Sequence, residues 1–586
     1  MQLSQEQTAA VHAESKNALC LAGAGSGKTR VLISRISHLI ENCHVSPYEI
    51  LTCTFTRKAG TELSERLEKE IDNQAHNVTI GTLHSVALRL IQRFGEFIGL
   101  NPGKITVYGP WEESVLLKDV CKELGYYNGK TWKQIKKKEI DAAFNLFYST
   151  GNRNERDYIP NEIMDAFFLR CRENNALTYG MIMTSFLELI PRIGHMLKYR
   201  HVLVDEVQDL DKLQWRCIRL ICSICDASLF VVGDTEQNIF SWRGSDHGYL
   251  IRNYDKFDVF KLTDNYRSDG YIVDAANKLI RHNKNRLDLE MRAKRGKGEA
   301  VQVILAMDSA KLVENIGNIP DSHPAGASDK NIAVLARNHY LLEKLSTLLS
   351  ESGIDHEYIG KKTAFTRSEE FRKVHAFLNL AVNPFDNFSF MLVKEYLGLS
   401  IEDYKAIRMQ AVKNNMSHFQ VFSGMVYQDF DEQFLIEYVE STKKCEFNPL
   451  LEWMEMVDFG FDDLPVIEFI HEYLSKVHQP TISDYLEWLS LYDVQDELTS
   501  EPKKLQLMTI HASKGLEFSM VIVAGLNEGI LPSFRAKTSE SELESERRLA
   551  YVAFTRAKDY LVLTSRPVDL KKKMPQVMSR FILEST

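Results

Sequence analysis

The chain has 586 residues, of which 44% are hydrophobic and 26% charged, and its formal net charge is −9 at pH 7. This length is too great for one hydrophobic core, and the composition is typical of globular proteins. No apolar run approaches the roughly 18 residues that a membrane helix needs, and the N-terminus lacks the basic-then-apolar plan of a signal peptide. We therefore expect a cytoplasmic protein, neither membrane-bound nor exported.

The net negative charge does not exclude a nucleic-acid partner, because a binding groove needs only a local positive lining. Lysines interleaved with aromatic residues do cluster in one segment: Lys122, Lys130, Lys133, Lys136, Lys137 and Lys138, with Tyr126, Tyr127 and Trp132. Taken alone, this cluster is better explained as a solvated helix face. Composition therefore decides neither for nor against nucleic acid.

Nine cysteines are scattered without regular spacing, which is typical of a reducing compartment. One close pair, Cys222 and Cys225, has the spacing of a zinc or redox motif. No second pair completes a zinc site, and the surrounding segment has the character of an apolar helix end. We expect buried free thiols here.

Strand and helix signals alternate along the first 85 residues and again after residue 200. The apolar segment 18–22 leads into a glycine-rich stretch and then into a segment with helical spacing. Further short apolar strands are expected at 50–55, 78–84, 201–206 and 228–234. Short apolar strands separated by helices predict a parallel sheet that helices cover on both faces.

Two helix-rich stretches interrupt alternating segments of this kind. A second alternating run follows residue 268, with strands expected at 301–306, 331–337, 505–511, 519–525 and 560–565. The sequence thus predicts an α/β protein with two parallel-sheet cores, each interrupted by a mainly helical insertion. The predicted boundaries are 1–85 and 191–264 for the first core, 86–190 for the first insertion, 265–380 and 496–586 for the second core, and 381–495 for the second insertion.

The glycine-rich stretch has the pattern of a phosphate-binding loop, in which backbone N–H groups turn inward around phosphate oxygens at the start of a helix. Lys28 can reach the β and γ phosphates, and Thr29 can place its hydroxyl on Mg²⁺. Ala22 replaces the usual first glycine, a small change that such a loop should tolerate. The stretch comprises Ala22, Gly23, Ala24, Gly25, Ser26, Gly27, Lys28, Thr29 and Arg30.

An acidic pair ends one of the predicted strands of the same core. Asp205 can hold Mg²⁺ there, and Glu206 can orient the attacking water as a general base. Acidic pairs at strand ends are common on protein surfaces, so this pair alone is weak support for catalysis. Together with the glycine-rich loop it predicts hydrolysis of a nucleoside triphosphate.

Two arginines in the second core suggest how hydrolysis is coupled to movement. A guanidinium presented to the γ phosphate by a facing domain stabilises transition-state charge, so that catalysis depends on domain closure. Arg267, at the start of that core, and Arg556, near its end, are the candidates. By itself the sequence favours a surface ion pair for either arginine.

These motifs resemble those of superfamily 1 DNA helicases of the UvrD/Rep/PcrA family, in the family's order and along nearly the whole chain. Residues 204–209 depart from the family pattern at Val207, where phenylalanine is more common. The turn at 397–400 only loosely resembles the family's duplex-contacting turn. The matching segments are residues 3–7, 22–30, 54–59, 81–85, 204–209, 233–244, 262–268, 508–518 and 546–558.

The resemblance implies two RecA-like cores and a role for each site residue. Gln237 is expected to sense the γ phosphate, and Arg267 and Arg556 to act as arginine fingers. The nucleotide is expected to meet Gln7 and Tyr266 at its adenine, with Arg30 and Glu517 nearby. The expected DNA track comprises Phe55, His84, Phe240, Trp242 and His511. Without the surrounding motif, core packing would better explain Phe240 and Trp242.

The implied cofactors are ATP and Mg²⁺, and the implied partners are single-stranded DNA and its junctions with duplex DNA. The expected function is ATP-dependent translocation from 3′ to 5′ on single-stranded DNA with unwinding of duplex DNA, in repair, recombination or replication. The alternative is an ATPase subunit of a larger repair or defence complex, stimulated by single-stranded DNA, that unwinds only with a protein partner. The third alternative is a binding module in which ATP only switches the conformation. Glu206 and the two arginine fingers argue against it, because such a switch needs no complete set of hydrolytic residues.

Overall fold

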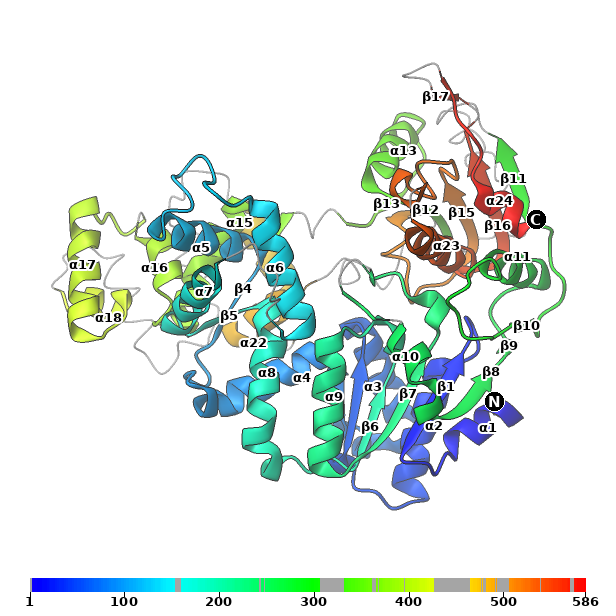
Figure 1. Ribbon diagram of the computed structural model, residues 1–586, viewed down its shortest axis with the longest axis horizontal. Coiled ribbons are helices and arrows are strands. Elements are labelled where there is room, and N and C mark those ends of the chain that lie inside the picture. The colour runs from blue at the N-terminus through cyan, green and yellow to red at the C-terminus, as the bar shows by residue number, and fades with distance from the viewer. Residues whose placement is uncertain are drawn as a thin grey trace. The chain divides into compact units, whose positions relative to one another are not determined.

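The computed structural model forms two compact units (Figure 1). The core unit comprises residues 1–83, 194–361 and 494–586, and the insertion unit comprises residues 84–193 and 362–493. The structure describes residues 3–152, 160–241, 244–246, 248–305, 331–360, 365–366, 368–394, 396–425, 464–475, 477, 481–490, 492, 505–537, 539–566, 568–569 and 574–586.

The first sheet of the core unit has six strands in the order β3-β2-β6-β7-β1-β8, all paired in parallel. Helices α1 (Gln5–Val11), α2 (Lys28–Glu41) and α3 (Arg57–Ile71) share a hydrophobic core with one face of this sheet. The strands are β3 (Thr79–Thr82), β2 (Ile50–Thr54), β6 (His201–Val204), β7 (Ser228–Gly233), β1 (Asn17–Ala22) and β8 (Asp258–Leu262).

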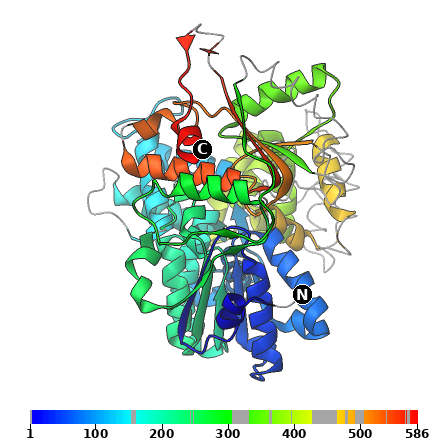
Figure 2. The ribbon, with the colours of Figure 1, turned by 90° about the vertical axis from the view of Figure 1, so that its right-hand side faces the viewer.

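The second sheet of the core unit is also six-stranded and parallel, in the order β11-β16-β15-β12-β14-β13. Helices α11 (Gly270–Ile280) and α23 (Glu540–Phe554) lie side by side on one face, and α13 (His339–Glu351) covers the other (Figures 1 and 2). The strands are β11 (Gln302–Leu305), β16 (Ala557–Ser565), β15 (Phe518–Ala524), β12 (Ile332–Ala336), β14 (Leu505–Thr509) and β13 (Glu357–Tyr358).

Shorter elements complete the core unit around the two sheets. They include the helices α9 (Lys212–Cys225), α10 (Gly248–Arg252) and α24 (Arg580–Ser585). Two two-stranded ladders pair β9 (Asp264–Asn265) with β10 (Arg292–Ala293) and β17 (Val568–Asp569) with β18 (Met574–Pro575).

The prediction of two parallel-sheet α/β cores is confirmed, and each predicted strand coincides with a strand of one sheet. The edge strand β8 was not predicted. Its sequence, DVFKL, carries two charged residues in five, and only Leu262 is fully buried. Because an edge strand is partly solvated, its apolar pattern is weaker than that of a central strand.

The insertion unit is mainly helical, as predicted, and it draws both insertions into one body. Among its described residues, one small sheet pairs β4 (Thr106–Tyr108) in parallel with β5 (Ala176–Thr178), two strands that the sequence did not predict. The helices are α4 (Leu83–Phe94), α5 (Pro110–Glu123), α6 (Lys137–Thr150), α7 (Asn161–Glu173), α8 (Tyr179–Ile193), α15 (Glu369–Val382), α16 (Asn387–Val393), α17 (Ile401–Asn414), α18 (His418–Ser423), α21 (Leu464–Leu474) and α22 (Ile482–Ser490).

Half of the lysines in the cluster of the first insertion, Lys130, Lys133 and Lys136, lie in the connection between α5 and α6 and not on a helix. Tyr127 and Trp132 pair across this connection, with ring centroids 4.9 Å apart, and Lys137 forms an ion pair with Asp141. The predicted helix face is therefore wrong for the segment 124–136, although its lysines are exposed as expected.

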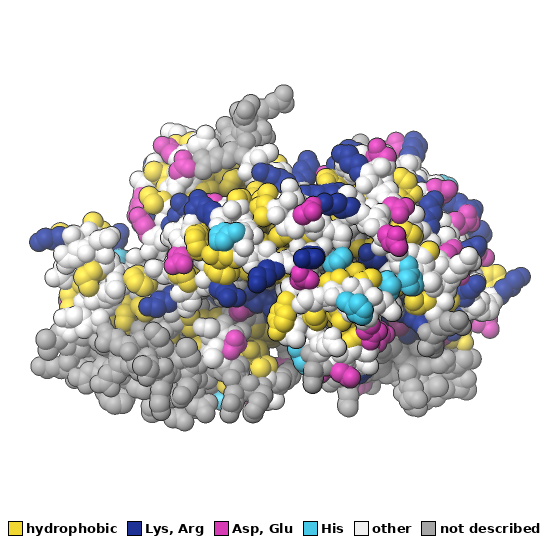
Figure 3. Space-filling view, turned by 90° about the horizontal axis from the view of Figure 1, so that it is seen from below, with side chains coloured by type: hydrophobic (Ala, Val, Ile, Leu, Met, Phe, Trp, Pro, Cys, Tyr) yellow, Lys and Arg dark blue, Asp and Glu magenta, His cyan; other side chains and the backbone are white. Residues whose placement is uncertain are grey.

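Cys222 is a buried free thiol at the end of α9, as predicted, whereas Cys225 is only half-buried. Burial raises the pKa of the Cys222 thiol to about 12, which leaves it protonated at neutral pH. Within the described ranges no helix combines the length and the hydropathy that spanning a membrane requires. On the face drawn in Figure 3, Lys and Arg side chains lie interspersed with Asp and Glu.

Candidate nucleotide site and nucleic-acid track

The glycine-rich loop joins the end of β1 to the first residue of α2. Gly25 and Gly27 have φ angles of +68° and +85°, in the left-handed region that favours glycine. A Cβ on Gly25 would lie 2.7 Å from Cβ of Arg267, and one on Gly27 would lie 2.8 Å from Nε2 of Gln7. The loop therefore requires glycine at both positions, as a phosphate cradle does.

Side chains from outside the loop hold its backbone in place. Nε2 of Gln7 donates to the Ser26 carbonyl at 3.0 Å, and Nδ2 of Asn265 donates to the Ala24 carbonyl at 2.7 Å. The backbone N–H of Tyr266 donates to the Gly25 carbonyl at 2.9 Å. Asn265 was missed by the sequence analysis, and only its place beside two predicted site residues could have drawn attention to it.

The remaining loop residues lie where the sequence predicts. Ala22 is the last residue of β1, Gly23 and Ala24 are buried, and Lys28, Thr29 and Arg30 form the first turn of α2. All three side chains are half-buried at the N-terminus of this helix.

The acidic pair follows β6 directly. Asp205 is 7% exposed, and its Oδ1 accepts a hydrogen bond from the backbone N–H of Glu206 at 2.9 Å. Oε1 of Glu206 lies 3.8 Å from Nζ of Lys28. Glu206 has φ +49° and ψ 41°, a left-handed conformation that costs a non-glycine residue about 1–3 kcal/mol and clusters at functional sites.

The electrostatic surroundings shift the pKa values of the two carboxyl groups in opposite directions. Burial and the neighbouring Glu206 raise the pKa of Asp205, against the effect of Lys28. Burial alone would also raise the pKa of Glu206, but Lys28, Lys514 and the Gln208 amide hold it below its ordinary value. Glu206 is therefore ionised at neutral pH, which is the state that a general base requires.

Lys514 is a buried site residue that the sequence analysis missed. Its Nζ forms an ion pair with the buried Asp209, donates to the Gln237 carbonyl at 2.8 Å and lies 4.0 Å from Oε2 of Glu206. Lys514 lies within the matched segment 508–518, so the motif itself was the signal that could have identified it. It links the second core to the acidic pair of the first.

Arg556 and Gln237 meet inside the core unit. Nη2 of Arg556 donates to Oε1 of Gln237 at 3.2 Å, and both residues are 2% exposed. Burial and the nearby Arg267 lower the pKa of Arg556 to about 9, so the guanidinium is still charged at neutral pH. Arg556 is therefore buried against Gln237, not in the surface ion pair that the sequence alone favours.

Arg267 lies beside the loop in a half-buried ion pair. Its Nε donates to Oε2 of Glu517 at 2.8 Å, and Lys558 forms an ion pair with the other oxygen of the same carboxylate. Burial alone would raise the pKa of Glu517, but Arg267 and Lys558 hold it below its ordinary value. Tyr266 is 44% exposed, which leaves its ring free surface for stacking.

Three of the predicted DNA-track residues come together in the core unit. Phe55 stacks on Phe240, with ring centroids 4.9 Å apart, and the His511 ring lies 6.0 Å from Phe240. Nζ of Lys514 lies 5.5 Å from the centroid of Phe55 and 5.2 Å from that of Phe240. Phe240 is only 7% exposed and belongs to a hydrophobic core cluster, as its core-packing alternative predicts.

His84 is the fourth predicted track residue that the structure describes. His84 belongs to the insertion unit, where its ring stacks on Tyr179 with centroids 4.4 Å apart and an interplanar angle of 10°. Tyr179 is 44% exposed and was not predicted. Trp242 lies outside the described residues.

The fold is that of an α/β protein with two parallel six-stranded sheets and a glycine-rich loop between β1 and α2, the class of the two-core helicases. The UvrD/REP helicase N-terminal domain matches residues 3–258, and the UvrD-like helicase C-terminal domain matches residues 260–446 and 465–566. The chain belongs to the UvrD/Rep/PcrA family of superfamily 1 DNA helicases, which are ATP-dependent enzymes.

Two relatives are similar to the chain over almost its whole length. The ATP-dependent DNA helicase PcrA of Staphylococcus aureus is 28% identical over 99% of this chain and 86% of that protein. The protein of the same name from Staphylococcus epidermidis is 27% identical over the same shares of the two chains.

Proposed function

We propose that the protein hydrolyses ATP with Mg²⁺, moves from 3′ to 5′ along single-stranded DNA and unwinds duplex DNA at its junctions with single strands. The observation that carries this proposal is the 3.2 Å contact between Arg556 and Gln237. This contact brings a charged residue of the second core to the loop side of the first, so closure of the two cores and hydrolysis are linked. Repair, recombination and replication are the processes in which such an activity acts.

The loop and its neighbours supply the chemistry of phosphate transfer. The loop amides and Lys28 bind the phosphates, while Glu206 accepts a proton from the attacking water. Gln237 senses the γ phosphate, and Arg267 and Arg556 stabilise the charge that develops there. Gln7 and Tyr266 meet the adenine, Arg30 lies near the nucleotide, and Glu517 lies near its ribose and phosphates.

Thr29 and Asp205 fit a magnesium site. Among the described residues no cluster of three or more His, Cys, Asp or Glu side chains could hold a metal ion. Mg²⁺ needs fewer, because it takes one or two protein ligands and completes its shell with phosphate oxygens and water. Bound there, Mg²⁺ would neutralise charge on the β and γ phosphates.

Single-stranded DNA is proposed to stack on the aromatic residues of the core unit and on His84 of the insertion unit. Nζ of Lys514 lies 5.5 Å from the ring centroid of Phe55, 5.2 Å from that of Phe240 and 4.0 Å from Oε2 of Glu206. A base that displaces a ring there would move Lys514 relative to Glu206, which gives DNA a direct route to the hydrolytic residues. Base stacking supplies about 1–3 kcal/mol per base.

Strand displacement with purified protein tests the proposal. With ATP and Mg²⁺, a duplex with a 3′ single-stranded tail should be unwound, and one with only a 5′ tail should not. ATPase activity should rise on addition of single-stranded DNA, which is measured in the same reactions.

Unwinding from the 5′ tail alone would refute the direction. DNA-stimulated ATPase activity without unwinding of either duplex would instead favour the ATPase subunit that needs a protein partner. An ATPase rate that is the same with and without single-stranded DNA would contradict the proposed link between Lys514 and the DNA track.

A further inference from the structure

Two residues of helix α23, and Arg556 just beyond its end, contact the turn that carries Gln237 or the residue before that turn. This turn is the short helix η6 (Thr235–Gln237), which follows β7 and Asp234 in the first core. The contacts join buried side chains of the second core to those of the turn: Nε of Arg548 to Oε2 of Glu236 at 3.7 Å, the hydroxyl of Tyr551 to Oδ2 of Asp234 at 3.5 Å, and Nη2 of Arg556 to Oε1 of Gln237 at 3.2 Å.

Asp234 determines which way the Gln237 amide faces. Its Oδ2 accepts from Nε2 of Gln237 at 2.8 Å and from the Tyr551 hydroxyl, while its Oδ1 accepts from the backbone N–H of Glu236 at 3.0 Å. With Nε2 bound to Asp234, the amide presents Oε1 to Arg556. Tyr551 therefore contacts the residue that orients the Gln237 amide, because both donate to Oδ2 of Asp234.

Arg548 anchors the neighbouring residue of the same turn. It is 1% exposed and lies 3.7 Å from carboxylate oxygens of both Glu236 and Glu544. Glu236 is 5% exposed and also accepts from the hydroxyl of Thr235 at 3.1 Å. A buried charge with these partners resists displacement, so two residues that precede Gln237, Asp234 and Glu236, are tied to α23.

We propose that Tyr551 and Arg548 are positioning residues for ATP hydrolysis, which act through Asp234 and Glu236 to hold the Gln237 amide with its Oε1 toward Arg556. The turn and α23 then move together when the cores close. The proposal rests on the role of Gln237 as γ-phosphate sensor given under Proposed function.

Replacing Tyr551 by phenylalanine removes the hydroxyl and keeps the ring, which is 3% exposed in the core. We expect the DNA-stimulated kcat to fall roughly three- to tenfold, the size of one lost hydrogen bond, with KM for ATP and Tm close to wild type. Tyr485→Phe is the matched control, because it removes a buried hydroxyl bonded to His375 in the insertion unit.

The same substitution in a Gln237→Ala background separates this proposal from the one it rests on. If Tyr551 acts through Gln237, Tyr551→Phe should cause no further loss there. An unchanged kcat for Tyr551→Phe, or an equal loss in both backgrounds, would overturn the positioning role. A wild-type kcat for Gln237→Ala would instead overturn the sensor role itself.

A different observation concerns the insertion unit, where the two insertions meet in a buried polar network. Nδ2 of Asn383 donates to Oγ1 of Thr106 at 2.9 Å and to the Asn174 carbonyl at 3.0 Å. The Tyr108 hydroxyl donates to Oδ1 of Asp386 and accepts from Nδ2 of Asn174 at 3.1 Å. All five residues are at most 4% exposed.

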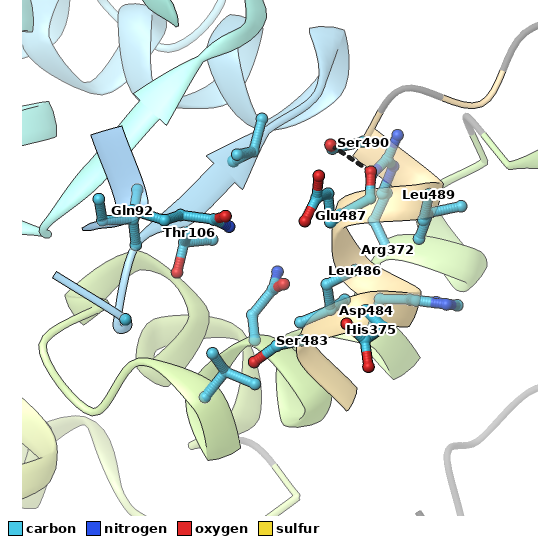
Figure 4. A pocket seen from close by; sticks show the side chains of 15 residues that line it. Gln92, Thr106, Arg372, His375, Ser483, Asp484, Leu486, Glu487, Leu489 and Ser490 are labelled. Carbon is cyan, nitrogen blue, oxygen red and sulfur yellow. Dashed lines mark hydrogen bonds between the residues drawn. The ribbon is translucent and has the colours of Figure 1, made fainter. Parts of the chain in front are cut away.

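The same junction continues into an ion pair and a small cavity. Arg372 of the second insertion lies 3.3 Å from the buried Glu112 of the first. A cavity of about 210 Å³ beside it is lined by Gln92 and Thr106 from the first insertion and by α15 and α22 from the second (Figure 4). Sliding one insertion over the other would leave buried donors and acceptors unpaired, at about 1–3 kcal/mol each. The network and the ion pair therefore hold the two insertions together in the insertion unit.

Discussion

Replacing Glu206 by glutamine is expected to lower ATP turnover by roughly 10²–10⁴-fold, the usual contribution of a general base. The substitution keeps the size of the side chain and removes its ability to accept a proton. Lys28 then loses an anion 3.8 Å away, so binding of the triphosphate should not weaken. Steady-state hydrolysis, with separate titrations of a fluorescent ATP analogue and of single-stranded DNA, measures the two effects.

Glu62→Gln is the matched control for this substitution. Glu62 lies on α3 of the same core, with its side chain 50% exposed and paired to Arg66, so its loss should leave turnover unchanged. A Glu206→Gln variant with normal turnover would place the base elsewhere, and one with weakened ATP binding would show that Glu206 acts in binding.

Replacing Arg556 by alanine is expected to lower DNA-stimulated turnover by roughly 10³-fold or more, on the scale of other arginine fingers. The variant removes the charge beside Gln237 and the contact that joins the cores. It also removes donors to the carbonyls of Val552 and Leu516, at 3.1 and 3.2 Å, so a lower Tm is expected as well.

Arg556→Lys separates the catalytic effect from the structural one. Lysine keeps the charge but lacks the planar fork that reaches both Gln237 and the backbone carbonyls. We expect its turnover to stay well below wild type even at temperatures where circular dichroism shows a folded protein. Arg580→Ala, which removes an arginine paired with Glu528 in the same core, is the control. Full turnover of folded Arg556→Lys would exclude a role for guanidinium geometry.

Local patterns predicted much of the fold. The strands at 18–22, 50–55 and 201–206 are short apolar runs, and such runs are recognisable wherever both faces of a parallel sheet are covered. The glycine loop was equally predictable, because Gly25 and Gly27 need conformations that other residues adopt only at a cost. The edge strand β8, with two charged residues in five, and β4, with only three residues, have patterns too weak to identify them.

The parts of the site that sequence analysis missed are those formed by contacts between distant segments. Lys514 pairs with Asp209 and Tyr551 with Asp234, and neither partner lies near the other in the chain. A lysine or a tyrosine within a matched motif has many common explanations, so its partner must be known before its role can be argued. The burial of Arg556 could not be predicted for the same reason, and the sequence alone favoured a surface position.

By itself the sequence determined the two-core α/β class, the phosphate loop and the family, because each depends on residue types at fixed short spacings along the chain. Only the tertiary structure decided that Lys514 lies near both the aromatic rings and the acidic pair, that Arg556 is buried against Gln237, and that the two insertions form one body. These features depend on which surfaces pack together after the chain has folded, and packing joins residues through shape and hydrogen bonds that no local period encodes.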